Sequence, residues 1–346
     1  MGTDLPPPLL IDPPLLNSAN PWASTREDLQ ALFDSPCTGA VTTRTATVAG
    51  FEHDSARHRC VFFDGKTHGV SSGSEGAGEK GSASLNNLGY SPIALDGYLG
   101  FIEEIVAGRA AGETRKGFVV SVAGTPDEVA VCYTRIRGLA GRLGGGGVLA
   151  MEVNLSCPNI PNSPPPAYEA GGLQACVRAV ARAGAREAGE GVRVPWGVKI
   201  PPYTHAGQFD MLMDVLRGTE GGVCPVSFVT ATNTLGSCLV LEEGEDGKNR
   251  PALGGSGIGG MAGAPLHPLA LGNVATLRRM LDSHPETSHV QIIGVGGVED
   301  AAGYRRMRDV GAAAVGVGTA LGRKGVRVFG EIEDGLRKLS KDKVVW

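Results

Sequence analysis

The feature that most constrains the fold is a repeated alternation of short apolar segments with amphipathic ones. Each apolar segment has the length and composition of a buried β-strand, and each is followed by a helical or long connecting segment. Strands that are buried on both faces and separated by helices form parallel sheets. Eight such units in 346 residues predict an α/β fold, a closed (β/α)8 TIM barrel, with an open doubly wound sheet as the alternative. The predicted strands span residues 39–47, 84–89, 118–122, 148–156, 196–200, 226–232, 290–295 and 313–317.

Capping residues mark the beginnings of several predicted helices. Thr125 is followed three residues later by Glu128, which predicts a capping box, and Thr25 (or Ser24) precedes two acidic residues. No linker divides the chain, so we expect a single domain over residues 1–346. The predicted helices span residues 25–33, 95–107, 125–143, 167–189, 205–216, 268–282, 300–310 and 325–338.

Three segments fall outside this alternation. Residues 1–25 are proline-rich and are expected to form an extended segment that covers part of a larger body. Residues 51–82 and 238–263 are rich in glycine and polar residues and are expected to be loop insertions. The second contains a Gly-x-Gly-x-x-Gly match at 255–260, but no strand precedes it, so a Rossmann nucleotide site is rejected.

Composition excludes several classes of function. The formal net charge of −4 does not suggest a nucleic-acid or membrane partner. Seven cysteines without Cys-x-x-Cys spacing argue against a disulfide framework and predict a reducing, cytoplasmic compartment. The first residues show neither a signal peptide nor a membrane anchor. No metal site is expected, because no standard ligand spacing is matched by His53, His58, Cys60 and His68.

The predicted strand at 148–156 ends in a group of polar side chains. Asn154 and Ser156 are two residues apart and therefore share a face, and Cys157 and Asn159 follow at the strand end. Chemistry in parallel α/β folds is placed at such ends. Amides suit a flat heterocycle, because each offers a donor and an acceptor. The thiol could act as a base, a nucleophile or a metal ligand, and an inert buried cysteine is the alternative.

The other predicted strand ends carry amides, cations and glycines. Lys199 ends an apolar strand, where burial of an ammonium is costly unless it is paired, so it could form a Schiff base or balance charge on a cofactor ring. Gly296-Gly297 and Gly318-Thr319 each precede a helix. Bare amides after strands seven and eight predict a phosphate site. The remaining ends contribute Arg44, Asn86, Asn233 and Thr234.

Taken together, these motifs resemble the dihydroorotate dehydrogenases, and within them the soluble class 1A enzymes that use fumarate. The resemblance extends from about Asn17 to Leu336. It rests on Asn-Leu-Ser-Cys-Pro-Asn at 154–159, Gly-Val-Lys-Ile-Pro-Pro-Tyr at 197–203, Gly-Ile-Gly-Gly at 257–260, Gln-Ile-Ile-Gly-Val-Gly-Gly at 291–297 and Gly-Thr-Ala-Leu at 318–321. It implies an FMN flavoprotein that oxidises (S)-dihydroorotate to orotate in de novo pyrimidine biosynthesis, uses fumarate as electron acceptor and forms a homodimer.

The resemblance also implies roles for individual residues. Cys157 would remove the C5 proton of dihydroorotate while C6 delivers hydride to flavin N5. Lys199 would lie against N1 and O2 of the flavin and stabilise its anionic reduced form. Substrate would be bound by Arg44, Asn86, Leu88, Gly89, Tyr90, Asn154, Asn159, Asn233 and Thr234. FMN would be held by Ala19, Asn20, Arg44, Thr45, Asn154, Lys199, Gly259, Gly260, Gly296, Gly297, Gly318 and Thr319.

The chain departs from the family in three respects. Arg44 stands where the family has lysine, and its planar guanidinium is bulkier. Tyr90 enlarges the expected active-site loop, and the insertions at 51–82 and 238–263 are longer than in the soluble family. Alternative functions are therefore a flavin oxidoreductase acting on another dihydropyrimidine, a phosphosugar lyase or isomerase that forms a Schiff base on Lys199, and a barrel that binds FMN without turnover. The sequence lacks an iron–sulfur cysteine cluster and a membrane-binding N-terminal helix, which disfavours reoxidation by NAD or quinone.

Overall fold

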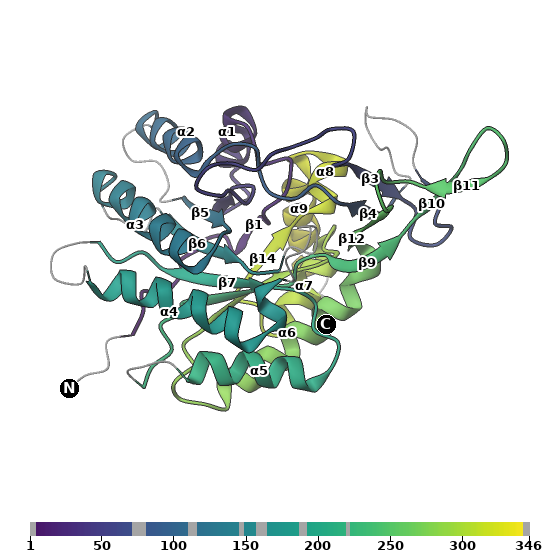
Figure 1. Ribbon diagram of the computed structural model, residues 1–346. Helices are drawn as coiled ribbons and strands as arrows, with labels where there is room; N and C mark the ends of the chain where they lie inside the picture. The colour runs from purple at the N-terminus through teal and green to yellow at the C-terminus, as the bar shows by residue number, and fades with distance from the viewer. Residues whose placement is uncertain are drawn as a thin grey trace.

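The computed structural model describes residues 5–70, 81–109, 116–144, 149–156, 165–186, 192–218 and 222–341. Parallel strands close a barrel in the order β1-β14-β13-β8-β7-β6-β5-β2 (Figure 1). This closure confirms the predicted (β/α)8 barrel and rules out the open doubly wound sheet. The barrel strands are β1 (Leu15–Asn17), β2 (Ala40–Thr42), β5 (Gly117–Val122), β6 (Leu149–Asn154), β7 (Trp196–Ile200), β8 (Phe228–Ala231), β13 (Gln291–Val295) and β14 (Ala314–Val317).

The predicted strand at 84–89 is not part of the barrel. Residues Ala83–Asn86 form β4 of a separate antiparallel sheet, so its assignment to the barrel was wrong. The barrel is instead closed by β1, which pairs with β14 through Leu15 and with β2 through Leu16. Because β1 has only three residues, its apolar pattern is too short to identify a strand within the proline-rich segment.

The N-terminal segment covers the end of the barrel at which the strands begin, as predicted. Leu9 packs among the inward-facing side chains of the barrel strands. Its backbone N–H donates to the side-chain oxygen of Gln291 at 2.7 Å, and its carbonyl accepts from the same amide at 3.0 Å. An extended segment is thereby fixed across the strand N-termini, leaving the C-terminal ends as the open face.

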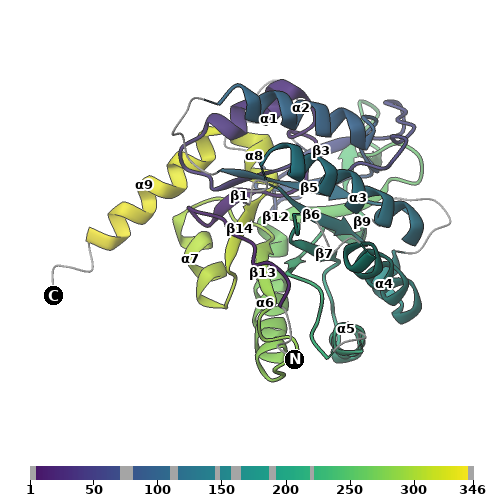
Figure 2. The same ribbon diagram turned by 90° about the vertical axis from the view of Figure 1, so that its left-hand side faces the viewer.

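Helices surround the barrel (Figure 2). The predicted N-cap of Thr25 and the capping box of Thr125 with Glu128 are confirmed, and Thr25 forms a second capping box with Asp28. Amphipathic helices bury their apolar stripe against the outer faces of the strands. The helices are α1 (Arg26–Asp34), α2 (Leu95–Ala107), α3 (Pro126–Arg142), α4 (Ala170–Arg186), α5 (Ala206–Arg217), α6 (His267–Asp282), α7 (Ala301–Asp309), α8 (Thr319–Lys324) and α9 (Arg327–Lys341).

The two predicted loop insertions contain β-strands, so their description as loops was wrong. β3 (Cys60–Phe63), β4, β12 (Ile258–Gly263) and β9 (Leu235–Leu239) form an antiparallel sheet in that order. β10 (Leu241–Glu243) and β11 (Asn249–Pro251) form a separate hairpin. The sequence of β12 reads as a loop because half of its residues are glycine. Those glycines permit close strand approach: a Cβ on Gly259 would lie 2.5 Å from the Asn86 carbonyl oxygen.

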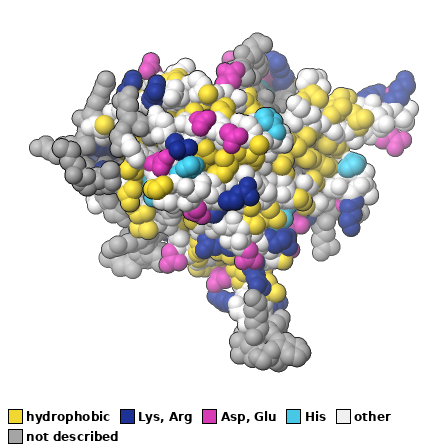
Figure 3. Space-filling model, turned by 90° about the horizontal axis from the view of Figure 1, so that it is seen from below, with side chains coloured by type: hydrophobic (Ala, Val, Ile, Leu, Met, Phe, Trp, Pro, Cys, Tyr) yellow, Lys and Arg dark blue, Asp and Glu magenta, His cyan; other side chains and the backbone are white. Residues whose placement is uncertain are grey.

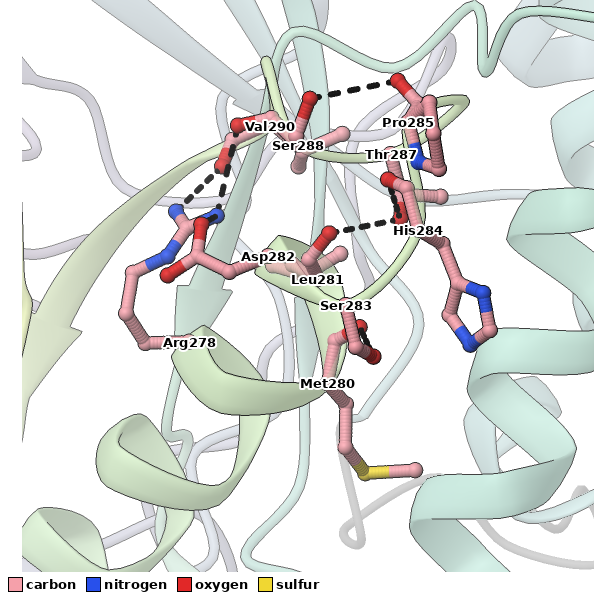
Figure 4. A network of polar contacts seen from close by, with 10 residues as sticks. All are labelled: Arg278, Met280, Leu281, Asp282, Ser283, His284, Pro285, Thr287, Ser288 and Val290. Carbon is pink, nitrogen blue, oxygen red and sulfur yellow. Dashed lines mark hydrogen bonds and ion pairs between the residues drawn. The ribbon is translucent and has the colours of Figure 1, made fainter.

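A compact hydrogen-bonded turn connects α6 to β13 (Figure 4). The Arg278 guanidinium donates to the carbonyl of Val290 at 2.8 Å and to the Asp282 carboxylate at 2.5 Å. The Thr287 hydroxyl donates to the carbonyls of Leu281 and His284 at 3.0 and 3.3 Å. These contacts satisfy the Leu281 carbonyl in the last turn of α6 and the carbonyls of His284 and Val290 in the connection that follows. They also fix the point at which β13 begins, and hence the position of the glycines that follow it.

The surface carries both charged and apolar side chains. Figure 3 shows apolar side chains gathered toward the end of the molecule from which the β10–β11 hairpin extends. Three of the exposed large apolar residues lie on neighbouring strands, namely Leu239 on β9, Leu241 on β10 and Ile258 on β12. Among the helices in the described part of the chain, none combines the length and the apolarity that a membrane crossing requires.

Candidate active site

A cavity lies at the C-terminal ends of the barrel strands. It encloses about 970 Å³ of empty space, part of it open to solvent. Its walls come from the segments that follow the barrel strands and from β3, β4 and β12 of the antiparallel sheet. The lining includes the following residues that were predicted to bind substrate or cofactor: Ala19, Asn20, Arg44, Thr45, Asn86, Leu88, Gly89, Tyr90, Asn154, Lys199, Asn233, Thr234, Gly296, Gly297, Gly318 and Thr319.

Four predicted site residues are not in this lining. Cys157 and Asn159 lie outside the described residues. Gly259 and Gly260 lie on β12, and Ala262 and Gly263 of the same strand line the cavity in their place. The carbonyl of Gly260 still contacts the site, because it accepts a hydrogen bond from the Asn86 side chain at 3.5 Å.

The amides of Asn154 and Asn233 form a hydrogen-bonded pair on the cavity wall. The Asn233 Nδ2 group donates to Asn154 Oδ1 at 3.3 Å and to Ser156 Oγ at 2.9 Å. Asn154 is at the end of β6, and Asn233 follows β8 with its backbone N–H donating to the carbonyl of Ile200. The predicted convergence of amides at the strand ends is therefore present, and it is held by contacts between three neighbouring strands.

Lys199 lies next to this amide pair. It is on β7 in register with Asn154, lines the cavity and is only 3% exposed. No hydrogen bond or ion pair joins its ammonium to any residue in the described part of the chain. A buried ammonium without a partner is costly, so its position favours a bound group that carries negative charge or accepts hydrogen bonds.

One side of the cavity is formed by the loop that follows β4. Arg44 donates to the carbonyl of Tyr90 at 3.1 Å, and the ring of Phe51 contacts Tyr90 edge-on with centroids 5.9 Å apart. Asn87, which was not among the predicted site residues, accepts a hydrogen bond from the Arg59 N–H at 2.8 Å and donates to the Gly254 carbonyl at 3.4 Å. Asn87 therefore connects both insertions to the loop.

The opposite end of the cavity is lined by backbone amides. In the described residues, no group accepts a hydrogen bond from the amides of Gly297 and Gly318. The φ of Gly297 is +68°, and a Cβ there would lie 2.6 Å from the Gly263 carbonyl oxygen. His267 fixes this turn through a 2.7 Å contact between its Nδ1 and the Gly296 carbonyl. Free amides in a glycine turn match the anion site predicted from sequence.

Several lining residues were not predicted. Ser18 and Trp22 follow β1, which was not recognised as a strand, and Trp22 stacks on Phe62 with centroids 5.6 Å apart. Cys60 lies on β3, within a predicted loop. Burial raises the pKa of the Cys60 thiol to about 12, so this cavity cysteine is a poor base at neutral pH. Recognition of β1 and β3 would have identified these residues.

Comparisons with known proteins agree with this geometry. Residues 79–339 match the family described as dihydroorotate dehydrogenase. The chain is 30% identical over 328 residues to dihydroorotate dehydrogenase (fumarate) of Trypanosoma cruzi, covering 94% of this chain and 89% of that protein. It is 26% identical over 330 residues to putative dihydroorotate dehydrogenase A (fumarate) of Streptococcus agalactiae, covering 95% and 90%. The ligand-free DHODH structure from Eimeria tenella shares the fold, with a TM-score of 0.68 at 20% identity, covering 95% of this chain and 84% of that one.

The family match spans most of the chain, including β4 and every described strand that follows it. The curated relative from Trypanosoma cruzi aligns over nearly the whole length, including the N-terminal part before the family match. The resemblance found from the sequence motifs is thus confirmed: this chain belongs to the dihydroorotate dehydrogenase family.

Proposed function

We propose that this protein oxidises (S)-dihydroorotate to orotate with bound FMN and passes the electrons to fumarate. The single observation that carries the proposal is the composition of one cavity. An unpartnered buried lysine, a pair of amides and a glycine turn with free amides line the same cavity. Family membership and two relatives named for fumarate support the same reaction.

The donor set fits FMN. The free amides of Gly297 and Gly318, with the hydroxyl of Thr319, suit a phosphate group. Lys199 supplies a cation for the electron-rich edge of the ring, and Asn154 supplies an amide. We infer that Ala19 and Asn20, which follow β1, and Thr45, which follows β2, complete this binding surface. When bound, FMN supplies a hydride acceptor, and the protein supplies orientation and charge.

The remaining chemistry belongs to this chain. Cys157, assigned from its position in the Asn-Leu-Ser-Cys-Pro-Asn motif, would take the proton from C5 of the substrate. Asn154 and Asn233 would hold the pyrimidine ring through its N–H and C=O groups, with Asn159 and Thr234 completing the contact. Lys199 would balance the negative charge that builds up next to it during the reaction.

The substrate carboxylate is assigned to the loop after β4. Arg44 supplies a guanidinium that can bind a carboxylate, and it is fixed by its contact with Tyr90. Asn86 and the backbone of Leu88 and Gly89 line the same side. Fumarate is also a carboxylate, so the same side of one cavity can bind both reactants in turn.

The test is a spectroscopic one. The purified protein should be yellow, and dihydroorotate added without oxygen should bleach the flavin absorbance. Fumarate should then restore the colour faster than quinone or NAD. A colourless protein trapped by borohydride on Lys199 would instead establish the Schiff-base lyase, and a yellow protein that dihydroorotate does not bleach would establish a barrel that binds FMN without turnover. Bleaching by another dihydropyrimidine but not by dihydroorotate would reassign the substrate.

We also propose that the protein forms a homodimer. Leu239, Leu241 and Ile258 are between 42% and 49% exposed, and Leu239 and Ile258 are paired across β9 and β12. Grouped exposed apolar residues are typical of protein–protein contact surfaces. Light scattering coupled to gel filtration would measure the mass. A monomer at micromolar concentration would contradict the proposal.

A further inference from the structure

A buried chain of hydrogen bonds leads from inside the barrel to the amide pair. Ser121 Oγ donates to Glu152 Oε1 at 2.8 Å. The hydroxyls of Ser121 and Thr45 are 2.9 Å apart, and Asn154 Nδ2 donates to Thr45 Oγ1 at 3.1 Å. All four side chains are at most 8% exposed, and they come from three consecutive parts of the barrel wall.

The carboxylate determines the direction of every bond in this chain. A carboxylate only accepts hydrogen bonds, so the Ser121 hydroxyl donates its proton to Glu152. Thr45 must then donate its own proton to Ser121. The oxygen of Thr45 is left to accept from Asn154, which places the nitrogen of the Asn154 amide on that side.

The contacts on the other side of the amide pair agree with this orientation. Asn154 Oδ1 accepts from Ser156 N at 3.2 Å, from Ser156 Oγ at 3.0 Å and from Asn233. Because the Asn233 nitrogen donates to Asn154 and Ser156, its oxygen is the atom left for a ligand. That oxygen accepts only from the N–H of Thr234 at 2.8 Å among the described residues, so one lone pair stays available.

We propose that Glu152 is a positioning residue that fixes the donor and acceptor sense of the amide pair through Ser121 and Thr45. The cavity then offers one N–H from Asn154 and one oxygen from Asn233. This pair is complementary to a ring edge in which a carbonyl adjoins an N–H, as in dihydroorotate and orotate. The inference deepens the proposed function and rests on it.

The location of Glu152 supports a role beyond stability. The neighbouring layer of inward-facing side chains, farther from the cavity, is apolar and includes Ala150, Val119 and Phe228. Apolar residues of similar size commonly stabilise a buried position as well as an ionic group does. A carboxylate joined to the cavity wall by two hydroxyl groups therefore indicates that its role is to set which atoms donate and which atoms accept along this chain.

The test compares orotate affinity in FMN-loaded variants. Ser121→Ala interrupts the chain, and Ser227→Ala is the matched control, because Ser227 is equally buried and its hydroxyl has no partner in the described structure. Orotate binding is measured by its perturbation of the flavin absorption spectrum. Because a buried hydrogen-bonded partner is lost, Ser121→Ala should bind orotate at least about tenfold more weakly than the unmodified protein, at unchanged FMN content. Ser227→Ala should bind orotate like the unmodified protein.

Three further variants separate orientation from folding. Ser121→Thr keeps the hydroxyl and should restore the affinity, whereas a defect caused only by altered packing would remain or worsen. Glu152→Gln can donate to Ser121 as well as accept, so it should weaken orotate binding even if Ser121→Ala fails to fold. The double variant Glu152→Gln with Ser121→Ala should bind no more weakly than Ser121→Ala, because both changes interrupt one chain.

The outcomes distinguish a failure of the proposed function from a failure of the proposed role of Glu152. If the unmodified protein binds neither FMN nor orotate, the proposed function fails. If it binds both, and Ser121→Ala and Glu152→Gln bind orotate with unchanged affinity, the function stands and the role of Glu152 is refuted.

Discussion

Replacement of Lys199 by methionine should raise the stability of the FMN-free protein and lower the activity of the FMN-loaded protein. Methionine has a similar length but no charge. Lys199 is 3% exposed and has no polar partner among the described residues, so FMN-free protein bears the cost of an uncompensated buried ammonium. Removing such a charge stabilises by about 1–3 kcal/mol. For 346 residues, an unfolding entropy of about 2.1 cal/mol/K per residue converts this into a rise of about 1.4 °C in melting temperature per kcal/mol.

Activity should fall at the same time. A preorganised charge next to the reacting centre contributes about 100- to 1,000-fold to turnover in comparable sites, and Lys199→Met removes it. The assay combines thermal unfolding of the FMN-free protein with anaerobic flavin reduction by dihydroorotate. Lower stability of FMN-free Lys199→Met would contradict this prediction, because it would show that the ammonium already has a stabilising partner.

Lys116 provides the matched control. It is also buried, at 5% exposure, but its ammonium donates to the carbonyls of Leu32 and Ser35 at 2.7 Å each and to the Thr38 hydroxyl at 2.5 Å. Lys116→Met leaves these acceptors at the end of α1 without their donor and should destabilise by about 2–4 kcal/mol. The same substitution at two buried lysines is thus expected to change the free energy of unfolding with opposite signs.

Three other predictions concern the cavity wall. Arg44→Ala should weaken orotate binding strongly and retain FMN, as measured by flavin spectral titration; unchanged orotate affinity would count against the carboxylate assignment. Asn87→Ala removes the contacts to Arg59 and Gly254 and should raise KM for dihydroorotate by about 5- to 30-fold with a smaller effect on kcat; steady-state kinetics would show a loss confined to kcat if the loop were unaffected. Burial raises the pKa of Cys60 to about 12, so its thiolate fraction grows only as pH rises toward that value, and alkylation followed by peptide mass spectrometry should find it largely unmodified at pH 8. Rapid labelling at pH 8 would show that the cavity wall opens at β3.

The barrel strands were predictable where they are continuous apolar runs. β7 was predicted with its exact bounds, and the other barrel strands after β2 differ by one or two residues at their ends. The strand ends also predicted Asn154, Lys199 and Asn233 as candidate site residues, and these three line one cavity because parallel strands bring their C-terminal ends to one face. The roles of Cys157 and Asn159 stay predictions from the motif, since both residues lie outside the described part of the chain.

The antiparallel sheet beside the cavity was not predictable in the same way. The strand β12 carries little apolar pattern, and its extended form comes from pairing with β4 and β9, which are distant in sequence. The roles of Asn87 and Cys60 follow from this sheet and were missed with it.

The fold class, the positions of most barrel strands and the family were predictable from the sequence alone, because these depend on local periodicity and on short motifs. Three features were visible only in the folded molecule: β1 closes the barrel, the insertions line the cavity, and Glu152 is connected to the amide pair through Ser121 and Thr45. Each of these depends on hydrogen bonds between strands that are far apart in the chain, as in the pairing of Leu15 with Val315. Such bonds leave no periodic signal in either partner, so the physical information exists only once the strands are side by side.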